Sequence, residues 1–377
     1  MHRPGRVPRL PIVAALLLAL VVLTGVPAWG AKAGRVHRVP ASIPYDCSVD
    51  VTTRLTTWIT KVPDRSTISF RKDGCYRIDG TLAMVNRAHL TFAGNGATLR
   101  ATTPGDQGRR HVSFVGGTDL VVRDFVVRGA NPNAGATPAA YVAQKAFQHA
   151  FAFTGVAGAR LEHVQAFDVY GDFVYIGAGG PQQRWSSDIR ITDSRFEGSG
   201  RQGISVTAGE HIVIARNEIG GVGRSLFDLE ANTADGGARD VLITHNVTGA
   251  ATNFWLANKG VGTQISDIVF TKNKMVEGTG GLVFVYGPTS GYRGPFVFEG
   301  NSLIVTDRVH DEGSVGAFFL SRASDVSILD NEVTFPLGRA VPVVEVQDST
   351  NVRVEGNTFT NAGAAQITTV RPGVAQP

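Results

Sequence analysis

The chain has 377 residues, of which 36 are basic, 32 are acidic and 45 are glycine. Three arginines and no acidic residues lie in the first 30 positions, so the remainder is nearly neutral, with 33 basic against 32 acidic side chains. This balance, without a Lys/Arg stripe interleaved with aromatic residues, excludes the usual nucleic-acid-binding surface, and no nucleic-acid partner is expected. Low charge with many glycine, valine, isoleucine and threonine residues indicates a β-rich chain with tight turns.

The first 31 residues have the pattern of a secretory signal peptide. Arg3, Arg6 and Arg9 form a basic segment, residues 11–23 are apolar, and small residues follow. Such a segment is removed on secretion, so we expect a secreted, extracellular protein. The apolar run is too short for a comfortable membrane span and no second one occurs, so no membrane span is expected after cleavage. An uncleaved N-terminal anchor is the alternative.

Residues 32–44 are expected to form a linker, and the folded domain then begins with a cysteine pair and a short helix. In an oxidising exterior, Cys47 and Cys75 favour a disulfide over a metal site or a redox motif, because there is no CxxC motif and no third cysteine. Apolar residues at helical spacing predict a helix with one buried face within residues 50–60. These residues are Val51, Leu55, Trp58 and Ile59. A helix of this kind can cover the open end of a repeating structure.

A repeat of the form apolar-x-apolar-x-x-Asn-x-apolar fills the C-terminal half of the chain. Its seven units are spaced 23 to 30 residues apart and contain Ser194, Asn217, Asn246, Asn273, Asn301, Asn331 and Asn357. This period, without a helical pattern, predicts the coils of a parallel β-solenoid. The paired apolar residues should point inward, because side chains alternate along a strand. Each Asn is expected at a turn, because asparagine tolerates a left-handed backbone, and equivalent Asn residues should form a ladder.

A second strand follows each turn, and its outward residues form two columns. The first column contains Tyr175, Ser205, Asp228 and Phe284, and the second contains Gly177, Thr207, Glu230 and Tyr286. Longer loops leave from the same edge, so a groove along this sheet is predicted. Residues 129–149 break the period and are expected to form a long loop, with a short helix or lid at 141–149.

These features together resemble one family. The Asn-turned coils, the N-terminal helix and the run from Thr91 to Leu99 (TFAGNGATL) resemble the right-handed parallel β-helix family of pectate-lyase-like proteins. The resemblance implies an all-β fold, a right-handed parallel β-helix over residues 45–366, with a frayed tail at 367–377. It also implies action on a polysaccharide. The polygalacturonase and epimerase motifs are absent, so no catalytic residue is carried over from those branches.

Polar residues that the repeat does not explain gather around Arg201 and Asp228. Asp228 and Glu230 are two positions apart on one strand face, which places their Cβ atoms about 6.5–7 Å apart. This separation suits the acid and base of an inverting glycoside hydrolase. It suits equally the oxygen ligands of Ca²⁺, the one cofactor that the residues suggest. In a third interpretation both carboxylates are solvated and paired with Arg201 or Arg224.

The same region offers a base for β-elimination. Proton abstraction next to a uronate carboxylate needs a base near the groove and a positive charge to stabilise the enediolate. Lys259, Arg201 and Tyr175 are the candidates, and Lys259 follows a strand one coil after Asp228.

Substrate binding is expected to involve polar and aromatic side chains around the same coils. The candidates are Asp172, Tyr175, Gln202, Asn232, Trp185 and Tyr286. Trp185 and Tyr286 lie in or beside the predicted loops, as does Tyr292, where flat rings can stack on sugars. Four histidines, His149, His163, His211 and His245, show no ligand spacing and are expected at the surface or in loops.

The sequence therefore predicts a secreted, monomeric β-helix that acts on a polysaccharide as a lyase or a glycoside hydrolase. Its catalytic candidates are Asp228, Glu230, Arg201 and Lys259. The alternative is a non-catalytic glycan-binding or cell-surface structural module, because solenoids serve that role with the same core pattern.

Overall fold

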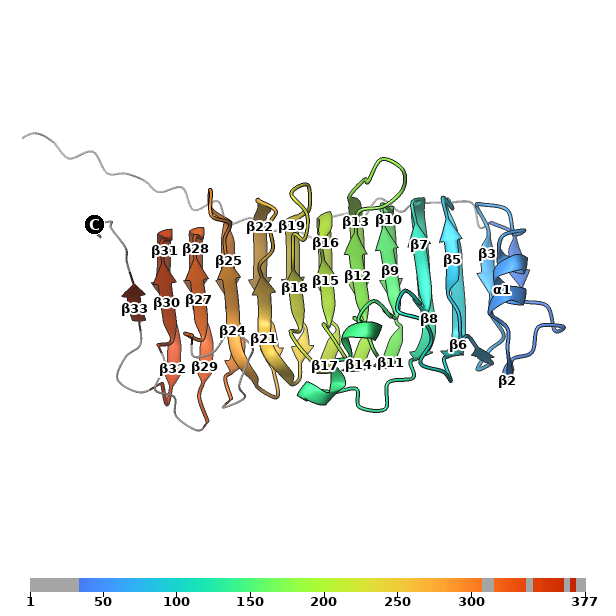
Figure 1. Ribbon diagram of the computed structural model, residues 1–377, viewed down its shortest axis with the longest axis horizontal. Helices are drawn as coiled ribbons and strands as arrows, with labels where there is room; N and C mark the ends of the chain where they lie inside the picture. The colour runs from blue at the N-terminus through green and yellow to red at the C-terminus, as the bar shows by residue number, and fades with distance from the viewer. Residues whose placement is uncertain (1–33, 307–314, 337–341, 363–366, 371–377) are drawn as a thin grey trace, which may run out of the picture. The chain divides into compact units, whose positions relative to one another are not determined.

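The structure is a computed structural model that describes residues 34–306, 315–336, 342–362 and 367–370. The predicted signal peptide, residues 1–31, lies outside the described residues. The described residues from Arg35 onward form one unit of stacked coils. Its named strands pair in parallel with the equivalent strands of neighbouring coils, as the predicted solenoid requires (Figure 1).

The strands fall into three faces. The first face contains β1 (Val36–Arg38), β3 (Thr67–Ser69), the start of β6 (Thr91–Arg100) and of β8 (Thr118–Arg128), β10 (Ala157–Glu162), β13 (Ser186–Thr192), β16 (Ala208–Ala215), β19 (Gly237–Thr244), β22 (Gln264–Thr271), β25 (Phe296–Glu299), β28 (Ser324–Leu329) and β31 (Thr350–Glu355). The second face contains β2 (Asp46–Asp50), β4 (Cys75–Arg77), the ends of β6 and β8, β11 (Gln165–Val169), β14 (Arg195–Ser199), β17 (Glu218–Val222), β20 (Val247–Thr248), β23 (Lys274–Met275), β26 (Ser302–Ile304), β29 (Glu332–Thr334) and β32 (Thr358–Thr360). The third face contains β5 (Leu82–Val85), β7 (Val112–Val115), β9 (Phe151–Thr154), β12 (Val174–Gly177), β15 (Ile204–Val206), β18 (Phe227–Leu229), β21 (Ala251–Asn258), β24 (Thr279–Tyr286), β27 (Phe318–Ser321), β30 (Val344–Gln347) and β33 (Ile367–Val370).

The inward and outward positions are those that the repeat predicts. Ile212 and Ile214 are each 1% exposed and belong to one continuous apolar core. On the third face Tyr175 pairs with Ser205, and Ser205 pairs with Asp228, so the predicted outward column exists. It places the polar residues of three coils side by side.

The predicted Asn ladder is present, but its asparagines do not have the left-handed backbone conformation that was expected from the sequence. Asn246 is typical: its backbone N–H and its Nδ2 both donate to Asn273 Oδ1 at 3.0 Å, and Nδ2 also donates to Ile214 O at 2.9 Å. Positive φ angles occur at the residue before each ladder asparagine, as in Arg216 and His245, and not at the ladder asparagines themselves. The residue before each asparagine therefore makes the tight turn, and the asparagine is needed for its buried amide, which bonds to the neighbouring coils.

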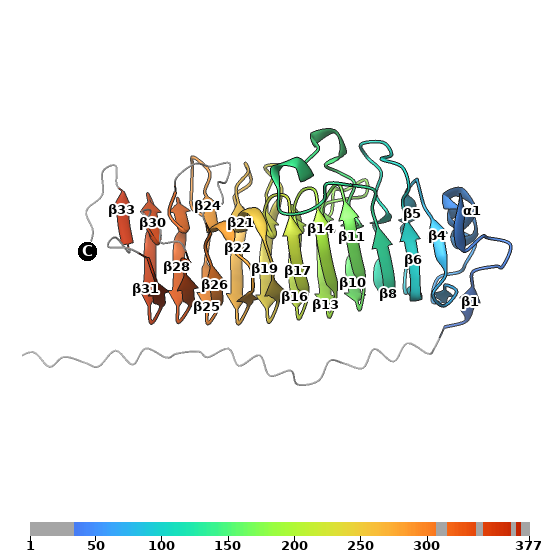
Figure 2. The ribbon, with the colours of Figure 1, turned by 90° about the horizontal axis from the view of Figure 1, so that it is seen from below.

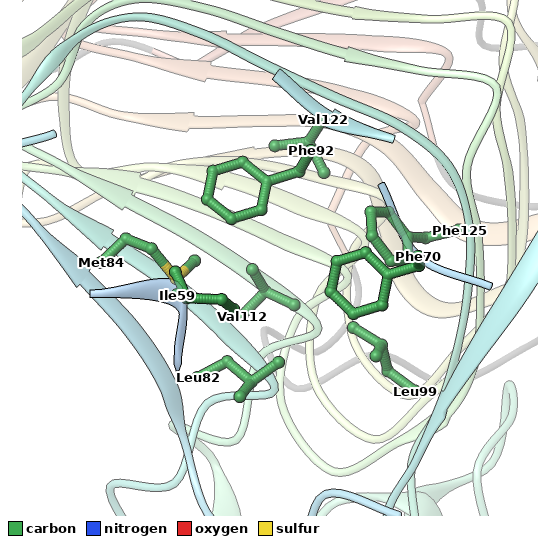
Figure 3. Close-up of a pocket in the computed structure, with 9 residues that line it drawn as sticks. All are labelled: Ile59, Phe70, Leu82, Met84, Phe92, Leu99, Val112, Val122 and Phe125. Atoms are coloured by element: carbon green, nitrogen blue, oxygen red, sulfur yellow. The ribbon is translucent and has the colours of Figure 1, made fainter. Parts of the chain in front are cut away.

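The N-terminal end is covered as predicted. The helix α1 (Thr52–Ile59) buries Leu55 and Ile59, and the predicted disulfide joins Cys47 in β2 to Cys75 in β4 with a Cα–Cα distance of 5.0 Å. Figure 3 shows Ile59 among the core residues that line an apolar space. The volume of this space is about 10 Å³. Since this holds at most about one water molecule, it is a packing gap and not a binding site.

The strand ladder extends beyond the predicted domain at both ends. β1 lies within the expected linker and pairs with β3, and β33 lies within the expected tail and pairs with β30. Both strands add to the open edge of a face, where unpaired backbone groups favour another strand. The period-breaking segment 129–149, called the excursion below, contains two short 3₁₀ turns, Pro138–Ala140 and Ala143–Lys145, where a short helix or lid was expected.

Candidate functional site

A cleft opens on the outer side of the third face, over the coils of β15, β18, β21 and β24. Its volume is about 200 Å³. It is lined by Tyr141, Arg201, Gln202, Arg224, Ser225, Asp228, Glu230, Asn253, Phe254, Ala257, Lys259 and Phe284. All four residues predicted as catalytic therefore line one cleft, although they come from three coils.

Arg201 is the centre of the cluster. It follows the end of β14, and its Nη1 donates to both carboxylate oxygens of Asp172, at 3.1 and 2.8 Å. Its Nη2 lies 3.3 Å from Glu230 Oε2 and 3.9 Å from Asp228 Oδ2. Burial alone would lower the pKa of Arg201, but the three carboxylates raise that pKa above its usual value. Arg201 therefore keeps its charge, which favours a role in stabilising negative charge over a role as a base.

Asp172 lies beneath Arg201 and does not line the cleft. Its side chain is fully buried, and Oδ1 accepts a 3.0 Å hydrogen bond from the backbone N–H of Gln202. Its own backbone N–H donates to His149 Nδ1 at 3.0 Å. Burial raises the pKa of Asp172, while Arg201 opposes that rise. Asp172 was expected to contact substrate. In the structure its carboxylate contacts Arg201 and the backbone of Gln202 instead.

Asp228 and Glu230 occupy different environments on the same strand. Asp228 is 2% exposed, and burial together with the neighbouring Glu230 raises its pKa well above the usual carboxyl range. Gln202 Nε2 donates to Asp228 Oδ2 at 2.9 Å, and Gln202 is itself fixed by the Ser225 backbone N–H, which donates to Oε1 at 2.7 Å. The Glu230 side chain is 20% exposed. One carboxyl is thus buried and favours its protonated form, and the other reaches solvent.

The two carboxyl groups are close enough to act on one bond. Asp228 Oδ2 and Glu230 Oε2 both contact the same nitrogen of Arg201, so their separation cannot exceed the total of those two contact distances. That limit exceeds the separation of about 5–5.5 Å that is typical of retaining glycosidases, and it reaches only the lower end of the roughly 6.5–9.5 Å that is typical of inverting ones. The geometry is compatible with both stereochemical outcomes.

Several predicted binding residues lie outside the cleft lining. The Tyr175 ring stacks on His149, with centroids 4.8 Å apart, and its hydroxyl lies 2.9 Å from Thr207 Oγ1. Trp185 donates from Nε1 to Asp235 O at 2.8 Å and stacks with Arg239 on the loop edge. Asn232 contacts Glu230 Oε2 at 3.3 Å, and Tyr286 stacks beside Phe284, which does line the cleft.

Tyr141, Phe254 and two histidines were not assigned to the site from the sequence. Tyr141 comes from the excursion and carries the Arg224 guanidinium over its ring at 5.0 Å. His149 lies in a loop, one of the two expected positions, but it is fully buried and lies with the buried His111 behind Asp172. Its sequence signal was weak, because the excursion has no repeat that fixes which of its residues face inward.

The described residues contain no group of three or more His, Cys, Asp or Glu side chains arranged to hold a metal ion. None of the helices in the same ranges has the length and hydropathy of a membrane span.

The repeat and the fold agree with a known family. The model of the right-handed β-helix region matches residues 183–372. The chain belongs to this family. A search of curated proteins found no significant match.

Solved β-helix structures resemble this one in fold. The surface adhesin PfbA of Streptococcus pneumoniae has a TM-score of 0.63 at 13% identity, covering 84% of this chain and 82% of PfbA. Endo-xylogalacturonan hydrolase from Aspergillus tubingensis has a TM-score of 0.61 at 14% identity, covering 89% and 95%. Alginate lyase from Paenibacillus sp. has a TM-score of 0.53 at 14% identity, covering 90% and 98%. The β-helix is thus shared by hydrolases, lyases and adhesins, and these likenesses establish the fold alone.

Proposed function

We propose that this β-helix protein is an extracellular glycoside hydrolase that acts on a polysaccharide. One observation carries the proposal: Asp228 and Glu230 meet at one guanidinium, and one of them is buried with a raised pKa while the other is partly exposed. A buried carboxyl with a raised pKa beside a partly exposed carboxyl is what glycoside hydrolysis uses. The disulfide supports an extracellular location, because disulfides persist in oxidising compartments.

In this mechanism Asp228 is the general acid and Glu230 the base or nucleophile. Gln202 donates to Oδ2 of Asp228, so a proton on that carboxyl would lie on Oδ1. Transfer of this proton to the glycosidic oxygen accompanies cleavage of the bond from that oxygen to the anomeric carbon. Water supplies the hydroxyl, and its second proton passes to Glu230 in an inverting reaction or returns to Asp228 in a retaining one. Arg201 stays charged and holds the carboxylates in place.

A non-catalytic glycan-binding module is the second candidate. The cleft carboxylates already contact Arg201, and Asp228 also accepts from Gln202. A network whose charged and polar groups are already hydrogen-bonded to one another can hold a binding surface rigid. The fold of the adhesin PfbA is compatible with this role.

The test is an activity panel of polygalacturonate, xylogalacturonan, alginate and neutral glucans. A hydrolase releases reducing ends without the ultraviolet absorbance of a new double bond, whereas a lyase produces that absorbance. We expect Asp228→Asn and Glu230→Gln to lower the rate by roughly 10²–10⁴-fold. Glu210→Gln is the matched control, because Glu210 pairs with Arg239 on the first face and does not line the cleft.

Other outcomes separate the alternatives. Binding without cleavage supports the glycan-binding module, and ultraviolet absorbance that depends on Lys259 supports the lyase. Loss of activity in EDTA, restored by Ca²⁺, supports the proposed Ca²⁺ ion. Full activity in both carboxyl variants, with the fold retained by circular dichroism, removes Asp228 and Glu230 from the mechanism.

A further inference from the structure

The outer side of the third face is covered before the cleft begins. Ser113 and Ala152 belong to the same outward column as Tyr175 and Asp228, yet they are only 3% and 0% exposed. Two segments lie over this part of the solenoid, the loop 101–111 and the excursion, and Figure 2 shows them side by side. Gln148 joins them, since its Nε2 donates to Pro104 O at 2.6 Å and its Oε1 accepts from Arg109 at 2.8 Å.

The excursion rests directly on the coils and leaves no passage beneath it. A Cβ atom on Gly171 would lie 2.8 Å from Gln148 C, and one on Gly200 would lie 2.6 Å from Ala140 O. Both positions therefore need glycine, because any side chain would collide with the excursion backbone. A glycan lying along the solenoid would meet this barrier at the coil of Arg201.

The opposite side of the cleft ends at an aromatic wall. Phe284 pairs in register with Phe319, and the stacked rings of Phe254, Phe284 and Phe319 have centroids 5.0 and 5.1 Å apart. Phe284 and Phe319 point outward but are only 4% and 5% exposed. The cleft thus extends over the four coils of β15, β18, β21 and β24, a length of about 14 Å at the spacing of parallel strands.

The cleft between these two barriers is a cup with a buried floor and an exposed rim. Gln202, Ser225 and Asp228 on the floor are 6%, 2% and 2% exposed, whereas Tyr141 on the rim is 37% exposed. A volume of about 200 Å³ is smaller than the roughly 300–1,000 Å³ of pockets for drug-sized ligands. The groove predicted along the whole sheet is therefore reduced to a short cup.

We propose that this cup takes the end of a glycan chain, one or two terminal sugar units, and not an internal stretch of the polymer. The proposal rests on the proposed function, in that the ligand is a polysaccharide. The excursion explains it physically: a chain that continued past it along the solenoid axis would have to displace the excursion backbone from Gly171 and Gly200. A terminal unit enters from solvent and reaches Asp228 at the floor.

The experiment compares polygalacturonate and alginate, each intact and as purified oligosaccharides of two to eight units. End recognition predicts that mono- or disaccharides are the only early products and that viscosity falls slowly relative to the reducing ends formed. If the protein binds without cleaving, end recognition predicts that bound protein follows the number of chain ends and not the mass of glycan. Early products of intermediate length, or binding in proportion to mass, overturn the proposal.

The outcomes also distinguish this proposal from the proposed function. Cleavage or binding that does not depend on chain ends contradicts end recognition and leaves the proposed glycan function supported. If no glycan is cleaved or bound, both proposals are contradicted. Tyr141→Ala, which truncates the rim, is expected to weaken binding of the trisaccharide by roughly two- to tenfold. Tyr292→Ala is the control, since Tyr292 is exposed and does not line the cup. Equal affinity of both variants for the trisaccharide contradicts the assigned rim.

Discussion

At the scale of single residues, the site depends on a buried carboxylate that does not face the cleft. Asp172 binds Arg201 through both oxygens, and Arg201 in turn contacts Asp228 and Glu230. Two charges removed from water stabilise the fold only while both are present and hydrogen-bonded. Removal of Arg201 leaves Asp172 buried without a counter-ion, and removal of Asp172 takes from Arg201 the carboxylate that it binds through both oxygens. Asp172 is therefore a positioning residue for the whole cluster.

We expect Asp172→Asn to lower the free energy of unfolding by about 3–5 kcal/mol, the usual cost of breaking a buried ion pair. Urea denaturation measures this effect. The control is Asp193→Asn, because Asp193 also binds an arginine through both oxygens, at 2.8 and 2.7 Å, but that pair with Arg216 is exposed. Its loss should cost about 0–1 kcal/mol. Similar losses in the two variants would contradict the structural role of Asp172.

The sequence could identify this cluster but could not assign its members. Asp228, Glu230 and Arg201 deviate from the repeat, and the register of the third face brings such deviations together. Asp172 and Glu230 have different roles because Asp172 is buried and Glu230 is not. The burial of Asp172 depends on the excursion, and no repeat predicts the path of that segment. The same cause explains why the burial of His149 was not predicted.

At the scale of elements, the loop that carries Lys259 is held by a buried arginine. Arg293 is 0% exposed, and it donates to Asn258 Oδ1 at 3.0 Å, Gly260 O at 2.7 Å and Gly262 O at 2.9 Å. Burial lowers its pKa to about 10, so it remains charged at neutral pH. Asn258 also donates to Leu229 O at 2.7 Å, which ties the loop to the strand of Asp228. The regular coils were predictable from their period, whereas this cross-coil contact was not.

Arg293→Met should therefore loosen the loop 258–262 locally. The three acceptors lose their donor, and we expect backbone hydrogen exchange there to rise by roughly 10- to 100-fold, equivalent to about 1–3 kcal/mol. Exchange in β16 on the first face should stay unchanged. The control is Arg322→Met, since Arg322 donates to Gly287 O but is partly exposed. An unchanged loop in the Arg293 variant would show that other contacts hold Lys259.

At the scale of the whole molecule, the cover formed by the loop 101–111 and the excursion contains two buried histidines, and their effect on the pH dependence of stability opposes that of Asp228 on the floor of the cup. Burial, with the nearby charge of Arg109, lowers the pKa of His111 to about 3, and neither of its ring nitrogens has a hydrogen-bond partner among the described residues. Burial also lowers the pKa of His149 and raises that of Asp228. Acid favours the unfolded state through the histidines, because only there can they bind protons, and favours the folded state through Asp228. The pH dependence of the free energy of unfolding is therefore the difference between the contributions of the histidines and of Asp228, and single variants are needed to separate them.

His111→Leu should make the protein more resistant to acid. Between its usual pKa near 6.5 and its folded value of about 3, His111 binds a proton only in the unfolded state, so it removes about 1.4 kcal/mol of stability per pH unit as the pH falls. Relative to the parent protein, the variant should gain about 2 kcal/mol between pH 7.5 and pH 5.0, measured by urea denaturation at both values. The contribution of Asp228 is common to both proteins and cancels. The control is His211→Leu, which removes an imidazole at a position that is 56% exposed. If the difference between His111→Leu and the parent does not change with pH, then His111 is protonated equally in the folded and unfolded states, and the cover does not exclude solvent from it.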